Sequence, residues 1–323
     1  MRIAVTGANG FVGSNLANYF HALGWETAAI VRPGADTSQI DPGVQVVPVD
    51  YFSPTELASA LASSEIVIHN AGKTRTRSYA EMLAANVVVT RKVLAAFNHN
   101  PGCRRFIYVS SQAASRPTQE LRAVTEEETS APVDWYGRSK ALSERIIRAE
   151  CAKEWTIVRP ASVYGPGERD FLQLFKSIKS GVNFSLGSQD QHLSLIHISE
   201  LCEFLGLCCT RENARNQLFF ASDGVAYSQS RFTALVEELL GKKALTLKIP
   251  IPLAKLAGYA GDLAETITGR TGLVNSQKIK ELLGPNWVCS SEKARDFLGW
   301  EPVPSLEGKL RQTLDWYIQQ GWL

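Results

Sequence analysis

Residues 2–13 of this 323-residue chain read RIAVTGANGFVG, and this stretch decides the fold. Residues 2–6 form the apolar run of a buried strand, and apolar residues then recur at helical spacing after the glycines. Gly7 permits a tight turn, Gly10 lets the backbone approach a pyrophosphate, and Gly13 lets helix and strand pack closely. The spacing differs from the common G-x-G-x-x-G, and a glycine turn without a ligand is the alternative. In this context we expect a dinucleotide site, because free N–H groups at a helix start favour anions.

Strand and helix patterns alternate from residue 1 to about 165. Strands are expected at 2–6, 26–31, 44–49, 65–69, 104–110 and 155–159, and helices at 11–23, 54–62, 78–98 and 134–152. Such alternation predicts an α/β fold with a Rossmann doubly wound parallel sheet.

The domain division follows from where this alternation stops. We expect a dinucleotide-binding domain at 1–168, with 195–222 returning to its sheet through a helix at 199–212 and a strand at 217–221. A smaller substrate-binding lobe with shorter helices is expected from 169–194 and 223–323, where prolines interrupt the pattern. The acidic segment 118–132 is expected to be a solvent-facing loop.

Tyr136 and Lys140 form a Tyr-x-x-x-Lys pair, with Ser111 one loop upstream. Residues four apart share a helix face, and a neighbouring cation would lower the pKa of the tyrosine from about 10. Tyr136 could then pass a proton to or from a substrate oxygen that Ser111 holds by a hydrogen bond. A surface tyrosine beside a surface lysine is the alternative.

Composition limits the class of protein. The formal net charge is +2, so no global field attracts nucleic acid or an anionic membrane. No apolar run is long enough for a membrane span, and the chain enters a strand at once, which favours a cytoplasmic protein without a secretory signal. The six cysteines form no C-x-x-C pair, so we expect reduced thiols and no metal site.

Further motifs make the chain resemble the extended branch of the short-chain dehydrogenase/reductase superfamily, the NAD-dependent epimerase/dehydratase enzymes. They include His69-Asn70-Ala71-Gly72, Asn86 in Asn-Val-Val-Val-Thr, Phe106 to Ser111, Val158 to Gly167, Phe297 to Pro302 and Leu314 to Tyr317. The resemblance implies that Lys140 holds the nicotinamide ribose and that Asp50 binds the adenine amino group. The implied cofactor-binding residues are Gly7, Asn9, Gly10, Phe11, Val12, Gly13, Arg32, Asp50, Tyr51, Asn70, Ala71, Gly72, Asn86, Ser110, Tyr136, Lys140, Pro160 and Val163.

The resemblance also implies a homodimer paired through the helices at 78–98 and 134–152. Both helices carry more apolar residues than one core-facing side would hold, so a second partner is expected. These residues are Val87, Val88, Val89, Leu94, Leu142, Ile146 and Ile147.

The cofactor choice depends on the end of the second strand. NAD sites usually place an acid there, whereas this chain has Arg32 and no acid until Asp36. An arginine can pair with a 2′-phosphate through its planar fork. NADP is therefore favoured, and NAD with Arg32 stacked on the adenine is the alternative.

Departures from the family narrow the chemistry. Ser111 is followed by Gln112-Ala113, where the dehydratases carry Asp-Glu, and Ser162 stands where the epimerases usually carry Asn. Residues 191–200 contain no arginine for a nucleotide diphosphate, and 249–287 resembles the tails of 3β-hydroxysteroid-dehydrogenase-like and dihydroflavonol-reductase-like members. We expect an oxidoreductase acting on a secondary alcohol or ketone. The alternatives are a sugar or nucleotide-sugar epimerase with tightly bound NAD, and a non-catalytic nucleotide-binding member.

The histidines receive structural interpretations. We expect His69 to pack under the cofactor site and His197 to make a buried hydrogen bond, and His192 is a weak candidate for the pocket mouth.

Overall fold

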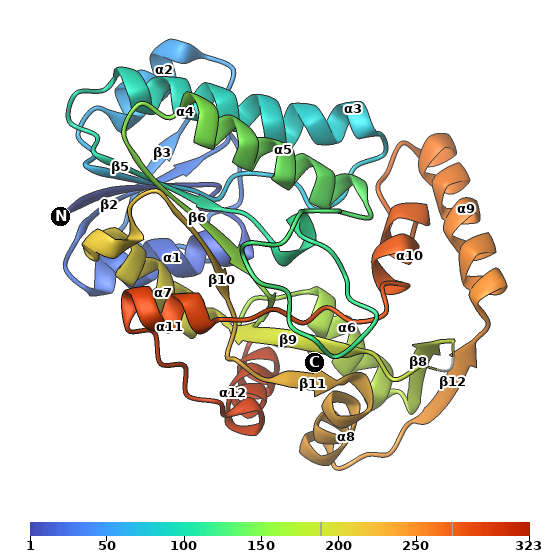
Figure 1. Cartoon of the computed structure of the whole chain (residues 1–323). Helices are drawn as coiled ribbons and strands as arrows, with labels where there is room; N and C mark the ends of the chain where they lie inside the picture. Colours follow the sequence, from blue (N-terminus) through green and yellow to red (C-terminus); the bar gives the residue numbers. More distant parts are fainter. Residues whose placement is uncertain (188, 273) are drawn as a thin grey trace.

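The computed structural model describes residues 1–187, 189–272 and 274–323. Its centre is a seven-stranded parallel sheet in the order β10-β6-β5-β4-β1-β2-β3 (Figure 1). Its strands are β1 (Arg2–Thr6), β2 (Glu26–Val31), β3 (Gln45–Pro48), β4 (Ile66–His69), β5 (Arg105–Val109), β6 (Glu154–Pro160) and β10 (Gln217–Ala221). The predicted doubly wound sheet is confirmed, and the strand expected at 217–221 pairs with β6.

Helices cover both faces of this sheet. The alternation of side chains along β1 divides the core, because Ile3 and Val5 face one cluster while Ala4 faces the other. One face is covered by α1 (Phe11–Ala22), α7 (Ile198–Thr210) and α11 (Glu292–Leu298), and the other by α2 (Pro54–Leu61), α4 (Val89–His99) and α5 (Trp135–Glu150).

The helix expected at 78–98 is not uniform. It comprises α3 (Tyr79–Met82), a π-helical turn (Leu83–Val88) and α4. A π turn adds a residue to one turn of the helix and is often found at functional sites. Here it carries Asn86, whose side chain is buried beside the catalytic candidates.

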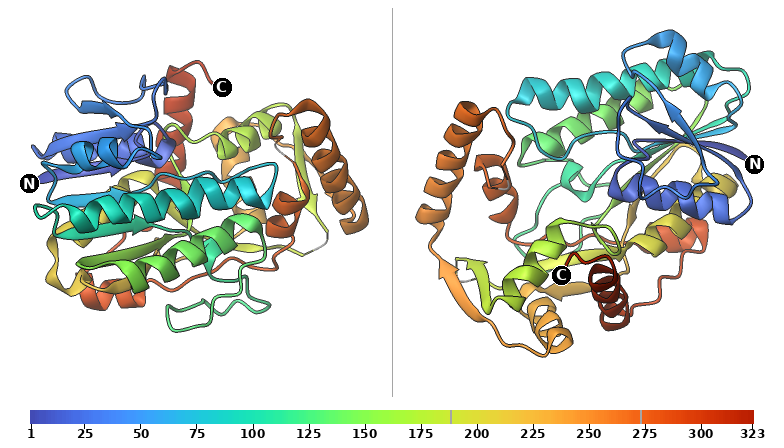
Figure 2. Two further views of the ribbon diagram at one scale, coloured as in Figure 1. Left: turned by 90° about the horizontal axis from the view of Figure 1, so that it is seen from above. Right: turned by 180° about the vertical axis from the view of Figure 1, so that it is seen from behind.

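The remaining elements form a lobe beside the carboxyl ends of the strands (Figure 2). It contains a three-stranded sheet of β7 (Ser162–Tyr164), β9 (His192–His197) and β11 (Ala226–Ser228), and a pair of β8 (Val182–Leu186) with β12 (Leu245–Ile249). Its helices are α6 (Asp170–Lys179), α8 (Gln229–Leu240), α9 (Ile251–Thr268), α10 (Ser276–Leu282) and α12 (Leu306–Gln319). The expectation of shorter helices is wrong for α9, which has 18 residues because Pro250 and Pro252 begin the helix rather than interrupt it.

The segment 118–132 is only partly exposed, which corrects the expected solvent-facing loop. Val124 is fully buried in a small cluster with Ala161 and Phe220. The carboxylate of Glu126 accepts a hydrogen bond of 2.8 Å from the backbone N–H of Phe220. One acidic residue of the run therefore attaches the loop to the edge strand β10.

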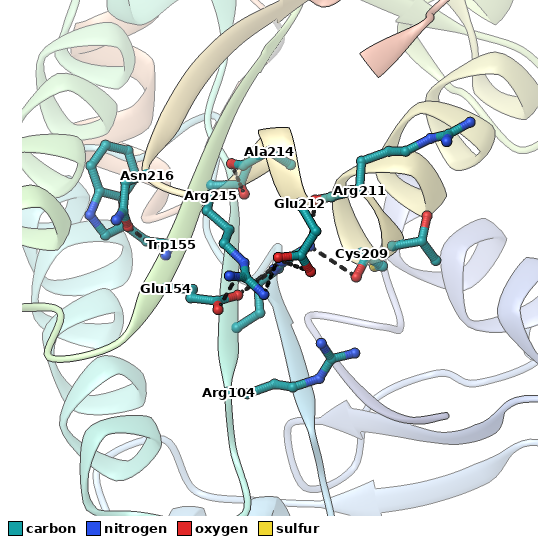
Figure 3. A network of polar contacts seen from close by, with 12 residues as sticks. Arg104, Glu154, Trp155, Cys209, Arg211, Glu212, Ala214, Arg215 and Asn216 are labelled. Carbon is teal, nitrogen blue, oxygen red and sulfur yellow. Dashed lines mark hydrogen bonds and ion pairs between the residues drawn. The ribbon is translucent and has the colours of Figure 1, made fainter. Parts of the chain in front are cut away.

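A buried guanidinium joins the carboxyl end of α7 to the amino end of β5. This is the end of the sheet away from the glycine turn. Arg105, fully buried at the start of β5, donates to the carbonyl oxygens of Cys208, Cys209 and Arg211 at 2.9–3.1 Å. It also pairs with Glu154 at 2.9 Å. Figure 3 shows the outer part of this network, in which Arg215 contacts both Glu154 and Glu212. The cation satisfies carbonyl groups that the end of a helix leaves unpaired.

The apolar residues assigned to a dimer face belong instead to the monomer core. Val87, Val89, Leu94, Ile146 and Ile147 are all less than one-tenth exposed and pack in the cluster under α4 and α5. Leu142 packs against the same cluster. Of the residues named for the interface, Val88 alone is largely exposed, at 40%. The premise of the dimer prediction is thus wrong, and the oligomeric state stays a prediction.

Candidate active site

The glycine turn has the geometry that a dinucleotide needs. Gly7 adopts φ +66°, and a Cβ there would lie 2.7 Å from the Cα of Ala71. A Cβ at Gly13 would lie 2.2 Å from the carbonyl oxygen of Gly7, so only glycine lets α1 sit this close to β1. At Gly10 the nearest atom would be 3.5 Å away, and no side chain caps the helix that begins there. The first-turn N–H groups, with Asn9, Phe11 and Val12 around them, are therefore available to an anion.

On the adenosine side, the structure separates three candidates. Tyr51 is buried, and its hydroxyl accepts from Gly7 N–H at 2.9 Å and donates to the Ile30 carbonyl at 3.2 Å. Its hydroxyl therefore braces the glycine turn, and the cofactor contact assigned to Tyr51 stays a prediction. Asp50 is exposed, with one carboxylate oxygen accepting from Phe52 N–H at 2.9 Å. The exposed side chain of Arg32 makes no ion pair with any described residue.

A buried chain of hydrogen bonds runs beneath the site from β1 to the π turn. Thr90 donates to the Asn86 carbonyl at 2.6 Å, so its oxygen accepts from His69 Nε2–H at 3.0 Å. Nδ1 of His69 then accepts a hydrogen bond of 2.7 Å from the Thr6 hydroxyl. The oxygen of that hydroxyl accepts hydrogen bonds of 3.2 Å from the backbone N–H groups of Asn70 and Ala71. Burial, with the charge of Lys140, lowers the pKa of His69 to about 3. His69 is thus uncharged at neutral pH and links Thr6 to Thr90, in agreement with the structural role expected for it.

Asn86 fixes the loop after β4 to the catalytic helix. Its Oδ1 accepts from Lys73 N–H at 2.7 Å, while Nδ2 donates to the Lys73 carbonyl at 3.0 Å and to Ser139 Oγ at 2.8 Å. A Cβ at Gly72 would lie 2.9 Å from Asn86 Oδ1, so the backbone passes close to this amide. The amide is therefore bonded to protein groups, which gives it a positioning role, and the expected cofactor contact stays a prediction.

Ser111 and Tyr136 meet at one cavity. They lie in the wall of a pocket of about 170 Å³ together with Asp134, Trp135, Gln277, Lys278 and Glu281. Ser111 begins a short 3-10 turn (Gln112–Ala114), and its Oγ accepts from Ala113 N–H at 3.1 Å. Gly137 packs against that turn, since a Cβ there would lie 2.1 Å from the Ala113 carbonyl oxygen. The start of α5 is thereby held against Ser111, which brings the two hydroxyls to one surface.

The protonation of Tyr136 differs from the sequence-based expectation. Burial raises its pKa above the ordinary value, the charges of Asp134 and Glu281 raise it further, and a hydrogen bond with Ser111 opposes them. Lys140 lies 5.9 Å from the centre of the Tyr136 ring, and its Nζ donates to the Val109 carbonyl at 2.7 Å. The expected lowering of the tyrosine pKa by Lys140 is therefore wrong for this structure, because burial and two carboxylates raise the pKa and Ser111 is the group that lowers it.

Lys140 is itself perturbed. Burial lowers its pKa to about 8, and the charge of Glu144 opposes this shift. Glu144 lies one turn further along α5 and forms a buried ion pair with Arg159 at 2.7 Å. The Ser110 hydroxyl donates to the same carboxylate at 2.5 Å, and the cofactor contact assigned to Ser110 stays a prediction. Sequence analysis did not identify Glu144, although the spacing Tyr136, Lys140, Glu144 places all three on one helix face.

A larger cavity of about 600 Å³ continues from Ser111 into the lobe. Pro160, Ser162 and Val163 line it from the sheet side, and Phe171, Leu174, Leu193, Val274, Leu282 and Trp287 make most of its apolar wall. Arg75 and Lys278 are the cations among the described lining residues of both cavities. Arg75 pairs with Asp170 at 2.5 Å and Lys278 with Glu281 at 2.9 Å. These charged residues carry no motif, so only the folded structure could identify them.

The structure shows the surroundings of His197 and His192. His197 caps α7 by accepting from Ser199 N–H, and burial lowers its pKa to about 4. The expected buried hydrogen bond is present, whereas His192 is not among the described residues that line either cavity. Within residues 1–187, 189–272 and 274–323, no three His, Cys, Asp or Glu side chains are grouped for a metal ion.

Comparison with known proteins identifies the family of the chain. The sequence profile of the NAD dependent epimerase/dehydratase family matches residues 3–218. The chain belongs to that family. Its relatives include a ceramide reductase of Caulobacter vibrioides, 28% identical over 327 residues, which cover 99% of this chain and 96% of the relative. A UDP-glucose 4-epimerase of Vibrio cholerae is also 28% identical, over 331 residues that cover 98% and 95%.

Solved structures share the fold along the whole chain. The crystal structure of gox2253 superposes with a TM-score of 0.81 at 24% identity, covering 99% of this chain and 98% of that one. The UDP-glucose 4-epimerase of Thermotoga maritima gives a TM-score of 0.81 at 19% identity, with 99% of each chain covered. At these identities the similarity establishes the fold, and the family includes both reductases and epimerases.

Proposed function

We propose that the protein is an NAD(P)-dependent reductase that interconverts a ketone and a secondary alcohol at Ser111, Tyr136 and Lys140. The observation that carries this proposal is the shared cavity surface of Ser111 and Tyr136 beside a pocket whose cations are already paired. The bound nicotinamide supplies or accepts the hydride at the substrate carbon. The protein supplies the proton at the substrate oxygen and holds that oxygen in place.

The protonation states support reduction as the direction. Because burial raises the pKa of Tyr136, its phenol is protonated at neutral pH and can donate to a carbonyl oxygen. Ser111 lies beside it and can donate a second hydrogen bond to that oxygen. Lys140, with a pKa of about 8, is mostly protonated at pH 7, and its charge would stabilise the phenolate left after proton transfer.

The charges of the cavity support a substrate without a diphosphate. Asp170 and Glu281 neutralise the two lining cations, and Asp134 and Glu168 add further carboxyl groups. A diphosphate in this pocket would lack an unpaired cationic partner among the described residues, which is costly away from water. The apolar wall fits a ketone with a substantial hydrocarbon part.

NADP is the cofactor that the nucleotide site favours in this proposal. The glycine turn offers N–H groups to a pyrophosphate, and Arg32 extends an exposed guanidinium at the end of β2. A 2′-phosphate would give that group a bidentate partner. The nicotinamide end would then lie toward Lys140 and Val163, on the cavity side of the sheet.

Replacement of Tyr136 by Phe tests the catalytic assignment. Ketone-dependent oxidation of NADPH should fall by about 10²–10⁴-fold, because only the proton donor is removed. Cofactor affinity, measured by fluorescence titration, should stay within about twofold of the wild type. Tyr79→Phe is the matched control, since this half-buried tyrosine packs on Trp135 beside the same pocket. Near-normal turnover by the Tyr136 variant would reject the tyrosine as catalyst.

An epimerase is the second candidate, supported by the relative from Vibrio cholerae. An epimerase retains its nicotinamide through the cycle, whereas a reductase must exchange it. Purified protein that keeps NAD through gel filtration and interconverts UDP-glucose and UDP-galactose would replace the reductase proposal. Free exchange of NADPH with stoichiometric alcohol formation would support it.

A further inference from the structure

Helix α9 packs on the protein with its small and acidic residues and turns its apolar residues outward, whereas an ordinary surface helix buries its apolar side. Its covered side carries small and acidic residues, namely Ala254, Gly258, Gly261, Asp262 and Glu265. A Cβ at Gly261 would lie 2.0 Å from the Val274 carbonyl oxygen, so the neighbouring loop packs directly on the helix backbone. Asp262 accepts from Ser276 N–H at 3.0 Å and Glu265 from Gly272 N–H at 2.8 Å. The two acids are thus used to hold α10 and its loop.

The outward side of α9 is apolar. Leu253 is 55% exposed, Leu256 63%, Leu263 62% and Ile267 75%. Their spacing of three, seven and four residues, with Ala260 between, puts them in one stripe, roughly opposite the buried residues. Figures 1 and 2 place α9 (orange) at the outer edge of the lobe, with α10 on its inner side. No described element of the chain covers this stripe.

The strand that leads into α9 extends the apolar area. Leu245 and Leu247 are two residues apart on β12, so they share one face, and they are 68% and 42% exposed. Phe184 of β8 is in register with Leu247 and is 54% exposed on that same face. We call Phe184, Leu245, Leu247, Leu253, Leu256, Leu263 and Ile267 the α9–β12 surface. Exposed apolar side chains grouped on neighbouring elements in this way mark interaction sites.

Basic residues lie along the segments that carry this surface. Lys243 is paired with Glu237 of α8 at 3.0 Å. Residues 241–270 contain four further basic side chains, Lys242, Lys248, Lys255 and Arg270, against two acids. Those acids are Asp262 and Glu265, both directed toward α10. The net charge of the whole chain, +2, concealed this local excess, which is why composition argued against an anionic membrane. An apolar stripe with a basic border has the pattern of a helix that lies in the interface of a bilayer.

We propose that the α9–β12 surface docks on a lipid bilayer that carries anionic headgroups. A second copy of the chain fits less well, because self-association would bring together two surfaces that both carry an excess of basic residues. None of the helices in the part of the chain that the structure describes combines the length and hydropathy needed to cross a membrane. The helix would therefore lie on the bilayer, with its leucines below the headgroups.

Vesicle sedimentation with the full-length protein tests the proposal. The probes are vesicles of phosphatidylcholine alone and of phosphatidylcholine with about 30% phosphatidylglycerol. We expect binding to the anionic vesicles that salt weakens, and at least tenfold weaker binding for Leu256→Ser with Leu263→Ser. The matched control is Leu23→Ser with Leu121→Ser, two leucines that are 52% and 58% exposed elsewhere. It should bind like the wild type.

Charge reversal provides the second arm. Lys248→Glu with Lys255→Glu should weaken binding at least tenfold, since each lysine near an anionic surface contributes about fivefold in affinity. Arg104→Glu with Arg145→Glu, an equal change of charge at exposed positions elsewhere, should have little effect. The assay needs neither cofactor nor turnover, so its result is independent of the proposed reaction.

Two results would overturn the proposal. Absence of sedimentation with anionic vesicles for a folded wild type would exclude bilayer docking. A wild-type dimer in light scattering that the Leu256 and Leu263 substitutions convert to monomers, without vesicle binding, would assign the surface to self-association instead. Circular dichroism establishes that the variants fold, and because the altered side chains are exposed, their loss should not affect stability.

Discussion

Asp134 acts on both the structure and the chemistry of the site. Its carboxylate caps α5 by accepting from Gly137 N–H at 2.7 Å. Burial raises its pKa to about 6, and its charge contributes to the raised pKa of Tyr136. The fold thus keeps a carboxyl group close to Tyr136, the proposed proton donor, at the cost of desolvating that carboxyl group. Asp134 therefore both caps α5 and raises the pKa of Tyr136, two residues further along the chain.

Asp134→Asn separates these two effects. Asn still caps a helix, but it cannot carry the buried charge. A carboxyl whose folded pKa is raised stabilises the fold below its unfolded pKa, and this stabilisation is lost as pH rises through about 6. The wild type should therefore lose about 2 kcal/mol between pH 4 and 7 relative to the variant. Urea unfolding of both proteins at pH 4 and pH 7 measures the difference, and parallel pH dependences would contradict it.

Residue-level chemistry was only partly predictable from the sequence. The placing of Tyr136 and Lys140 on one helix face followed from their spacing. The pKa of Tyr136 did not, because it depends on burial and on Glu281, which lies 145 positions away along the chain. The pairing of Arg75 with Asp170 likewise joins residues 95 positions apart. Local patterns identified the candidate catalytic groups, whereas their protonation depends on residues of the lobe that lie far away in the sequence.

At the scale of elements, the glycine turn can be tested by two substitutions of equal size. Gly13→Ala should destabilise the protein by at least about 3 kcal/mol, because its Cβ would overlap the Gly7 carbonyl at 2.2 Å and force α1 from β1. Gly10→Ala should change stability by less than about 1 kcal/mol, since its Cβ meets nothing closer than 3.5 Å. Thermal unfolding without cofactor compares the two.

The same pair distinguishes packing from ligand approach. Under the proposed site, Gly10→Ala should weaken cofactor binding despite its normal stability, because the added methyl group occupies the path of the pyrophosphate. Unchanged cofactor affinity in that variant would show that the pyrophosphate lies elsewhere. A stable Gly13→Ala protein would show that α1 can shift without penalty.

The periodic pattern predicted elements more reliably than their irregularities. The apolar runs placed β1, β2 and β10 at their observed bounds. The π turn around Asn86 was not visible, because its sequence keeps the apolar spacing of a continuous helix. The nature of α9 was missed for a different reason. Its prolines suggested an interruption, and its apolar stripe would ordinarily indicate a core-facing side.

At the scale of the whole molecule, the structure divides charge and apolar surface between its parts. The sheet domain presents the N-terminus of α1 and the exposed Arg32, whereas the lobe presents the α9–β12 surface. The cavity with Tyr136 lies between the carboxyl ends of the strands and the lobe. A cofactor that binds only the folded sheet domain raises the free energy of unfolding, so its binding can be followed by thermal unfolding.

Cofactor preference can be measured through this stabilisation. If Arg32 pairs with a 2′-phosphate, NADPH should bind about tenfold or more tightly than NADH, since charge-assisted hydrogen bonds contribute about 1.5–3 kcal/mol. At equal saturating concentrations, NADPH should then raise the melting temperature by roughly 2–4 °C more than NADH. Arg32→Asp should abolish that difference by adding repulsion, while Arg104→Asp, at another exposed arginine, should preserve it. Equal stabilisation of the wild type by both cofactors would show that Arg32 only packs on the adenine and that NAD remains open.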